Sequence, residues 1–423
     1  MQNQQNPLTK WVVLIGSAIA LMVSYSPAIQ QPWGIYMKPI AASFGWDRTM
    51  VTLGYSIVPL VAAPLAFVVG LIIDRVGNRG VILVQAMAIP TLLMAFSTLQ
   101  PVMWQFLLVT CFGGVVNSLS TPASLTSILL QWFDKRLGMA LGLSMAALGI
   151  GTALLPPLIS HWIALWGWRE AFRVEALILG TIGILNALLL VWDNKAVVAA
   201  KKRHKNHVAV LAGFSLRDAV AHPVFWRVVV CFFLMGMIFA GVSVHFVPIM
   251  IDQGMSPQRA AMFFGLMGIA QISGRLLCAA VLDRVKIIRF STSIYMFTTA
   301  ALALLQLSIP GREFLVPIFL GLAAGVEVDV MGLIVRRWFG MRSAARIYAL
   351  GFIGFMLGAS SGPLVMAFFY DRMGSYQIPM LIFTLGTVVV AWLFAGIGRY
   401  PQMREERGAV DEVPYVAGHG ATS

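Results

Sequence analysis

Apolar stretches long enough to cross a lipid bilayer recur along the whole of this 423-residue chain. A helix rises ~1.5 Å per residue, so about 20 apolar residues span a hydrocarbon core of ~30 Å. Every backbone N–H and C=O group is then paired within its own helix, as the lipid interior requires. We expect an all-α membrane protein with twelve spanning helices, at residues 11–37, 51–73, 81–98, 104–130, 138–160, 170–192, 225–251, 259–282, 290–309, 314–335, 345–369 and 377–398.

The composition is that of a membrane protein, and the distribution of charge predicts its orientation. Of the residues, 59% are hydrophobic and 11% charged, whereas soluble domains carry about 25% charged residues. When the loops are assigned alternately to two sides, 22 of the 30 Lys and Arg residues fall on the side that holds both termini, and seven on the other. The positive-inside rule places both termini in the cytoplasm, in an inner or plasma membrane. The net charge of +13 then reflects topology and contact with anionic lipid, so no nucleic-acid partner is expected.

The sequence offers no framework for a metal, a cofactor or a disulfide. Cys111, Cys231 and Cys278 fall within predicted spans, and their spacing matches neither metal motifs nor paired cysteines. Because nucleophile motifs and cofactor loops are also missing, we expect neither an enzyme nor a cofactor. The first span exceeds the apolar region of a signal peptide and is expected to stay in the mature protein.

A weak internal repeat predicts two halves. Ile73-Asp74-Arg75-Val76 after the second span is echoed by Leu282-Asp283-Arg284-Val285 after the eighth, and Trp132-Phe133 after the fourth by Trp338-Phe339 after the tenth. Parallel repeats of this kind build two six-helix bundles related by an axis along the membrane normal. We divide the chain into a first bundle (1–192), a polar cytoplasmic linker (193–224), a second bundle (225–400) and a cytoplasmic tail (401–423) with the composition of a disordered segment.

Prolines interrupt several predicted spans and remove backbone donors there. We expect the helices to bend or unwind at these positions and to line a transport pathway, packing kinks being the alternative. The prolines concerned are Pro27, Pro32, Pro59, Pro64, Pro156, Pro157, Pro248 and Pro363.

The loop after the second span carries a specific motif. Residues 70–79 read Gly-Leu-Ile-Ile-Asp-Arg-Val-Gly-Asn-Arg and resemble the signature of the major facilitator superfamily between helices 2 and 3. Glycines allow a tight turn, and a carboxylate with two guanidiniums can latch helix ends, whereas a plain positively charged loop is the alternative. The resemblance implies the major facilitator fold and a cytoplasmic gate that stabilises the outward-open state. The internal repeat adds Asp283 and Arg284 to this gate. The gate residues are Gly70, Asp74, Arg75, Gly77, Arg79, Asp283 and Arg284.

Three further segments look like the monocarboxylate porter family and its bacterial oxalate/formate-exchanger-like branch. They are residues 34–39 (Gly-Ile-Tyr-Met-Lys-Pro) followed by Phe44-Gly45-Trp46, residues 132–136, and Gly274-Arg275. This resemblance covers nearly the whole chain and implies that the arginine of helix 8, here Arg275, binds the substrate carboxylate. Gln271, one turn earlier, stands where eukaryotic relatives often have an aspartate.

Arg275 carries the chemical prediction. It lies roughly 12 Å into the membrane from the Asp283 end, where an unpartnered charge costs several kcal/mol. Its planar guanidinium can take a carboxylate bidentately, whereas lysine cannot, and an anionic substrate supplies the counter-charge. We expect Arg275 and Gln271 to face a central cavity and bind substrate; the alternative is a fixed ion pair between Arg275 and an acid of the tenth span.

Two acids of the tenth span are candidate proton carriers. Glu327 lies about 13 Å from the Arg336 end, a depth that matches Arg275, and Asp329 follows two residues later. Residues two apart on a helix point about 200° apart, so at most one of the two faces the cavity. Burial favours the neutral acid and a nearby arginine favours the carboxylate, so substrate binding can switch the proton.

Other polar side chains within the spans are candidate pathway residues. His245 is a proton relay, a substrate donor or a satisfied packing residue. Gln31, Asn117 and Tyr348 are expected to line the cavity. The eleventh span holds no Lys or Arg between Ile347 and Tyr370, where oxalate exchangers of this branch carry a second cation, so the single arginine favours a monoanion.

These features predict a secondary active transporter that moves a small monocarboxylate by alternating access, with proton symport. The cargo is a lactate-like or pyruvate-like acid, or a larger aliphatic or aromatic one. The alternatives are carboxylate exchange without net proton movement, and a membrane sensor that binds the acid without moving it. The sensor is disfavoured because no kinase, nucleotide-binding or DNA-binding segment is present to pass on a signal, and no obligatory protein partner is expected.

Overall fold

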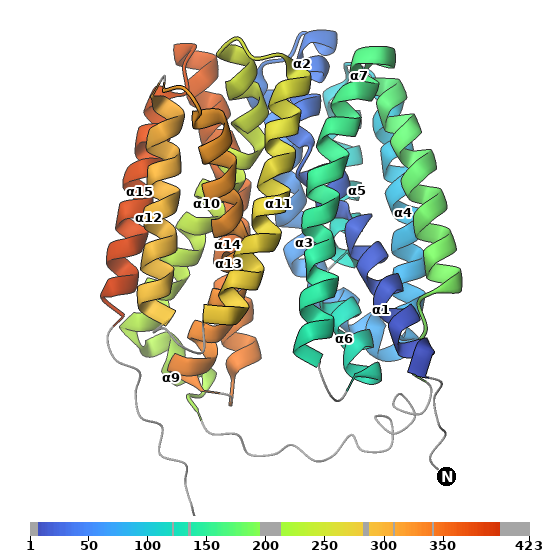
Figure 1. The fold of residues 1–423 in the computed structure, drawn as a ribbon, viewed down its shortest axis with the longest axis vertical. Helices are drawn as coiled ribbons and strands as arrows, with labels where there is room; N and C mark the ends of the chain where they lie inside the picture. The colour runs from blue at the N-terminus through green and yellow to red at the C-terminus, as the bar shows by residue number, and fades with distance from the viewer. Residues whose placement is uncertain are drawn as a thin grey trace, which may run out of the picture.

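The computed structural model describes residues 7–120, 122–133, 137–194, 213–281, 287–307, 309–340 and 342–397, and these ranges are helical except for short connections. Two bundles stand side by side with their long helices along a common direction (Figure 1). The first contains α1 (Pro7–Met22), the π-helical turn η1 (Ser26–Gln30), α2 (Trp33–Phe44), α3 (Arg48–Val76), α4 (Asn78–Ser97), α5 (Met103–Leu119), α6 (Pro122–Trp132) and α7 (Leu137–Leu189). The second contains α9 (Leu216–Ala221), α10 (Pro223–Asp252), α11 (Pro257–Val281), α12 (Ile287–Gln306), α13 (Arg312–Phe339), α14 (Ala344–Met373) and α15 (Gln377–Ala395).

The described helices account for twelve crossings of a membrane. Nine helical segments are long and apolar enough to span one. The segment Leu137–Leu189 counts twice, because Gly167 interrupts it with φ 81° and ψ 167°. The shorter apolar helix α5, continued by α6, and the 20-residue α12 complete the set. The predicted all-α fold of twelve spanning helices is confirmed.

The first crossing is unwound where two prolines were expected to disturb it. α1 ends at Met22, and the chain passes through the π-helical turn with Pro27 before Pro32 precedes α2. A proline lacks the N–H that would continue the hydrogen-bond ladder, so the crossing is built from two shorter helices. α3, α7, α10 and α14 run through their prolines as continuous helices, so unwinding does not occur there.

The fourth crossing differs from the single helix expected over 104–130. α5 ends at Leu119, and Pro122 starts a separate helix, α6. Pro122 is at the first helical position, where its missing N–H costs nothing, and it therefore favours a new start over continuation.

Glycines bring neighbouring helices to backbone contact. A Cβ on Gly358 of α14 would lie 1.9 Å from the carbonyl oxygen of Phe233 in α10. A Cβ on Gly274 of α11 would lie 2.3 Å from the carbonyl oxygen of Leu322 in α13. Because lipid gives little hydrophobic drive for helix association, such close van der Waals contact holds membrane bundles together.

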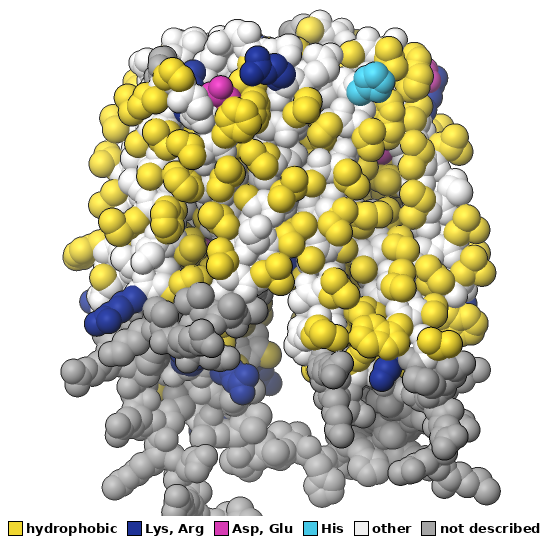
Figure 2. Space-filling model, viewed as in Figure 1, with side chains coloured by type: hydrophobic (Ala, Val, Ile, Leu, Met, Phe, Trp, Pro, Cys, Tyr) yellow, Lys and Arg dark blue, Asp and Glu magenta, His cyan; other side chains and the backbone are white. Residues whose placement is uncertain are grey.

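The flanks of the molecule are apolar. Large hydrophobic side chains such as Phe67, Leu177 and Trp392, each at least 72% exposed, point outward from the bundles. Figure 2 shows hydrophobic side chains spread over the height of one face, with the visible charged groups near its two ends. A contiguous apolar surface of this extent fits contact with lipid.

The two bundles meet at one end and part toward the other. α1 begins and α15 finishes at the same end, the lower one in Figure 1, which we call the terminal end. The space-filling surface is hollowed between the bundles at this end (Figure 2). At the opposite end, polar side chains of the two bundles bond directly to one another.

Part of the segment predicted as a linker packs against the second bundle. The Phe214 N–H donates to the carbonyl oxygen of Phe339 (2.8 Å), and Ser215 caps the short helix α9. The basic cluster at 201–205 and the tail at 401–423 lie outside the described residues.

Candidate functional site

Helices α7 and α11 cross at the boundary between the bundles. A Cβ on Gly268 of α11 would lie 2.6 Å from both the Ala153 nitrogen and the Gly149 carbonyl oxygen of α7. Ile272 contacts the same Gly149 one turn further along. Positions three or four residues apart share a helix face, so this contact face continues to residue 275. The packing of α11 therefore aims Arg275 at the first bundle.

Arg275 bridges the two bundles where they begin to part. Its Nη1 donates to the carbonyl oxygen of Met145 in α7, and its Nε donates to that of Gly325 in α13, both over 3.4 Å. Both bonds are long, since N–H···O bonds cluster near ~2.9 Å. The side chain is half-buried. These carbonyls orient the guanidinium along the boundary that a rocking movement would change.

Of the two acids predicted as proton carriers, Glu327 lies apart from this bridge. Glu327 is buried at 8% exposure and lies near Tyr295 of α12, inside the second bundle. It points about 200° away from Gly325, the residue whose backbone contacts α11. Among the described residues, no ion pair joins Glu327 to Arg275. The side chain of Asp329 lies outside the described residues, so its role stays a prediction.

The remaining candidate lining residues are dispersed over both bundles. Gln271 on α11, Gln31 beside the unwound turn and Asn117 near the end of α5 are each half-buried. Tyr348 of α14 is half-buried and stacks on Phe352, with ring centroids 5.9 Å apart. Gln30, which precedes Gln31 and was not among the predicted lining residues, donates to the Tyr55 hydroxyl of α3 (3.4 Å).

His245 is a fully buried residue with both ring nitrogens bonded. Nε2 lies 3.0 Å from the carbonyl oxygen of Pro363, which can only accept, so Nε2 carries a hydrogen. In the neutral ring, Nδ1 then accepts from the Tyr376 hydroxyl at 2.9 Å. Burial raises the pKa of the Tyr376 hydroxyl, while Arg48 opposes that shift, and the group remains a neutral donor. This geometry favours the packing role of His245 over the substrate-donor role.

An ion-pair network closes the end opposite the termini. Arg48, the first residue of α3, donates from Nη1 and Nη2 to the two carboxylate oxygens of Asp252 at the end of α10 (2.7 and 3.0 Å). Lys38 of α2 donates to the same carboxylate (2.6 Å). Arg48 also donates to the Tyr376 hydroxyl, and its guanidinium stacks 3.6 Å from the ring centroid of Tyr370. We call these contacts, with the cap described next, the far-end latch.

The second bundle also caps a helix of the first. Asp371 of α14 accepts from the backbone N–H groups of Arg48 (3.2 Å) and Thr49 (2.8 Å) and from the Thr49 hydroxyl (2.6 Å). These N–H groups are unpaired within α3, and a carboxylate at a helix N-terminus is favoured by the helix dipole. The start of α3 is therefore satisfied only by a residue of the other bundle, as far as the described contacts go. The sequence prediction missed Arg48, Asp252 and Asp371; charges flanking predicted span ends were the available signal.

The superfamily-like motif lies at the terminal end and binds within its own bundle. Gly77 has φ 91°, a left-handed value that favours glycine, and a Cβ there would lie 3.0 Å from Asp193. Asp193, which follows α7, accepts from the Arg79 backbone N–H (3.0 Å), and the Arg79 guanidinium donates to the Leu188 carbonyl (3.0 Å). A Cβ on Gly70 would meet open space. The side chains of Asp74 and Arg75, and the whole of Asp283 and Arg284, lie outside the described residues.

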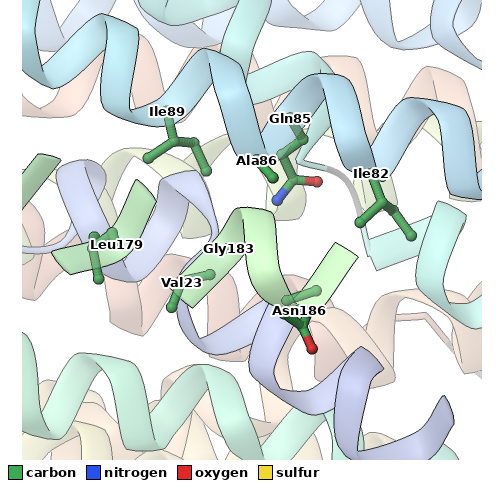
Figure 3. Close-up of a pocket in the computed structure, with 9 residues that line it drawn as sticks. Val23, Ile82, Gln85, Ala86, Ile89, Leu179, Gly183 and Asn186 are labelled. Atoms are coloured by element: carbon green, nitrogen blue, oxygen red, sulfur yellow. The ribbon is translucent and has the colours of Figure 1, made fainter. Parts of the chain in front are cut away.

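A small cavity inside the first bundle lies apart from the bundle boundary. Figure 3 shows residues of α4 and α7 around it, with Val23 of the chain after α1. Its free volume is about 10 Å³, close to the space for one water molecule. The Gln85 Oε1 and Asn186 Oδ1 atoms are buried there without hydrogen-bond partners among the described residues. The cavity is too small for an organic acid.

Transporters are among the curated proteins similar to this chain. Riboflavin transporter RibJ of Trypanosoma brucei brucei is 28% identical over 44% of this chain and 34% of its own length. Monocarboxylate transporter 1 of Bos taurus is 26% identical over 46% of this chain and 38% of its own. The oxalate:formate antiporter of Oxalobacter formigenes is 25% identical over 53% and 51%. The chain thus spans between about a third and a half of these relatives, and the predicted resemblance to monocarboxylate and oxalate/formate porters is confirmed.

Both the fold and the family follow from two further matches. The solved structure of the nucleoside transporter NupG superposes with a TM-score of 0.72 at 16% identity, covering 92% of this chain and all of that one, which shows a shared fold. The family model described as Major Facilitator Superfamily matches residues 13–328, the greater part of the sequence. With its two bundles of six crossings and its glycine-rich loop at the terminal end, the chain belongs to the Major Facilitator Superfamily.

Proposed function

We propose that this protein transports a small monocarboxylate across its membrane by alternating access, together with a proton. The observation that carries the proposal is the Arg275 guanidinium, which bonds to both bundles at the level where they separate. A carboxylate bound there would contact the part of the molecule whose geometry changes in each cycle. A carboxylate would add charge-assisted bonds to the guanidinium, which are shorter and stronger than bonds to neutral carbonyls.

The observed conformation is one of the two end states that this mechanism needs. The far-end latch closes one side, and the hollow between the bundles opens the other (Figure 2). By the positive-inside rule we assign the terminal end to the cytoplasm, so the conformation is inward-open. Two relatives, one named for monocarboxylate and one for oxalate and formate, support an organic anion as cargo. Another relative is named for riboflavin, so similar proteins also carry other molecules.

The decisive experiment replaces Arg275 by lysine in proteoliposomes. A panel of labelled acids, including lactate, pyruvate and aromatic acids, is offered under an imposed pH gradient. Arg275→Lys keeps the charge but loses the bidentate fork, and we expect uptake to fall by about 10- to 100-fold, the loss of one charge-assisted bond. The matched control is Arg337→Lys, an exposed arginine at the end of α13, which should transport normally. Undiminished uptake by Arg275→Lys would rule out the bidentate role.

Carboxylate exchange is the second candidate, and one relative is named as an antiporter. In this case counterflow persists after the proton gradient is collapsed, and substrate addition produces no alkalinisation. Proton symport predicts the reverse: gradient-driven accumulation with alkalinisation of the external medium. Binding without either flux would instead identify a sensor.

A further inference from the structure

Glu175 is an acid in the interior of the first bundle, on α7 and away from Arg275. It is fully buried. The Tyr36 hydroxyl of α2 donates to its Oε2 atom (2.9 Å), and its Oε1 atom has no hydrogen-bond partner among the described residues. Phe172 stacks on Tyr36 with centroids 3.9 Å apart, and Phe96 stacks on Phe172 at 5.3 Å. The carboxyl group therefore lies beside stacked aromatic rings and has one hydrogen-bond partner among the described residues.

The described surroundings of Glu175 favour its neutral form. On α7 itself, Arg173 pairs with Glu170, and Arg169 donates to the Leu99 carbonyl. α5 contains no Asp, Glu, Lys or Arg, and the one such residue of α4, Arg79, donates to the Leu188 carbonyl at the terminal end. Tyr36 is the titratable group of α2 that contacts the acid. A carboxylate shielded from solvent by full burial and held by the one hydrogen bond found among the described residues is strongly disfavoured relative to the protonated acid. We infer that Glu175 is protonated in this conformation.

One short helix separates this acid from the second bundle. Tyr36 covers Glu175, whereas Gly34 and Lys38 lie about 200° around α2 and face α10. A Cβ on Gly34 would lie 2.1 Å from the Val244 carbonyl oxygen, and Lys38 pairs with Asp252. α2 also follows the unwound turn and so is a separate 12-residue segment. When the far end opens, α2 loses its support on α10, and water gains a route to Glu175.

We propose that Glu175 is a proton-binding site whose occupancy is linked to closure of the far end. This inference rests on the alternating access proposed above, but not on the identity of the cargo. Opening moves the proton from the neutral Glu175 to water and leaves a hydrated carboxylate; closing requires its return. The closed state binds one more proton than the open state. At pH values above the ordinary pKa of an exposed glutamate, the ratio of closed to open molecules therefore falls by up to about tenfold for each pH unit. Acidity on the far side therefore favours closure.

The other titratable groups around α2 and α10 predict a different sign or no effect. Protonation of Asp252 would remove its pairs with Lys38 and Arg48 and would favour opening at low pH. His245 and Tyr376 lie within the second bundle on the other side of that network. A rise in the closed fraction on acidification is thus specific to an acid that must be neutral in the closed state.

The test measures the far-end distance at several pH values. Nitroxide labels are placed by Ala42→Cys and Gln258→Cys, exposed positions on the two bundles, in a background in which Cys111, Cys231 and Cys278 are replaced. In the otherwise unaltered chain, acidification from pH 8 to pH 5 should raise the closed fraction. Glu175→Gln should be closed throughout and insensitive to pH, while Glu170→Gln, an acid of the same helix whose side chain is 47% exposed, should behave like the parent.

A second measurement keeps the inference falsifiable if Glu175→Gln does not fold. The infrared spectrum of the parent protein at neutral pH should contain the C=O band of a buried protonated carboxyl, and Tyr36→Phe should move that band to higher frequency because a hydrogen bond is lost. A pH response in Glu175→Gln equal to that of the parent, or a band unmoved by Tyr36→Phe, overturns the proposal. Failure of acid uptake with an intact pH response would instead reject only the proposed cargo.

Discussion

Replacing Asp252 by asparagine should release the far-end latch. The carboxylate is shared by Arg48 (2.7 and 3.0 Å) and Lys38 (2.6 Å), and asparagine keeps the size but removes the charge. The side-chain exposures are 24% for Asp252, 12% for Arg48 and 32% for Lys38, so solvent screens both pairs. An exposed ion pair contributes about 0.2–1 kcal/mol, and the less exposed bidentate pair about 1–2 kcal/mol.

Together these terms favour the closed state by about 2 kcal/mol, which corresponds to a shift of roughly 30-fold toward far-end opening in Asp252→Asn. The label pair at Ala42 and Gln258 reports this shift as growth of a long-distance population. Glu313→Gln, an acid in the first turn of α13 at the same end, is the matched control and should leave the distribution unchanged. An identical distance distribution in Asp252→Asn and the parent would refute the assignment of the latch as an energetic element.

Three other substitutions probe separate parts of the structure. Gly268→Ala places a Cβ 2.6 Å from backbone atoms of α7, so we expect labels to show a reduced closed fraction, whereas Gly332→Ala, which meets open space, should be silent. Asp193→Ala removes the acceptor of the Arg79 N–H and should lower stability in detergent by about 1 kcal/mol without shifting the bundle equilibrium, as judged by thermal unfolding and the same labels. Tyr376→Phe strips buried His245 of its donor and should cost about 1–3 kcal/mol of stability in the same unfolding assay; an unchanged midpoint contradicts the hydrogen-bonded role.

Features that depend on local periodicity could be predicted from the sequence. Apolar length gave the twelve crossings, and Pro27 with Pro32 gave the break in the first of them. The position of Arg275 toward α7 also follows from local spacing, because Gly265, Gly268 and residue 275 share one face of α11. The break before Pro122 had the same kind of signal, a proline able to start a helix, and was overlooked.

Features that depend on distant partners could not be predicted. Asp371 caps α3 through Thr49, a residue 322 positions away, and nothing in the sequence around either residue specifies the pairing. The Tyr36–Glu175 bond joins residues 139 apart. Glu327 had the depth of Arg275, but its direction is decided by the packing of α13 on α11 and α12, which only the fold supplies.

In the proposed transport cycle, the far-end latch and Arg275 place different requirements on the step in which the carrier returns without substrate. In the latch, the first bundle supplies the cations Lys38 and Arg48 and the second the acids Asp252 and Asp371, so closure there neutralises charge whether or not substrate is bound. At the centre, closure of the terminal end withdraws Arg275 from water, and a buried guanidinium needs a counter-charge. If the cargo is the proposed carboxylate, it would provide this counter-charge whenever substrate is bound. Net symport then requires a protein acid to provide it on the empty journey, and exchange does not. Because Glu327 points away from α11, a symporter would have to neutralise Arg275 with Asp329 or with an acid brought close by a rearranged tenth crossing. The counterflow experiment decides whether the chain needs such an acid.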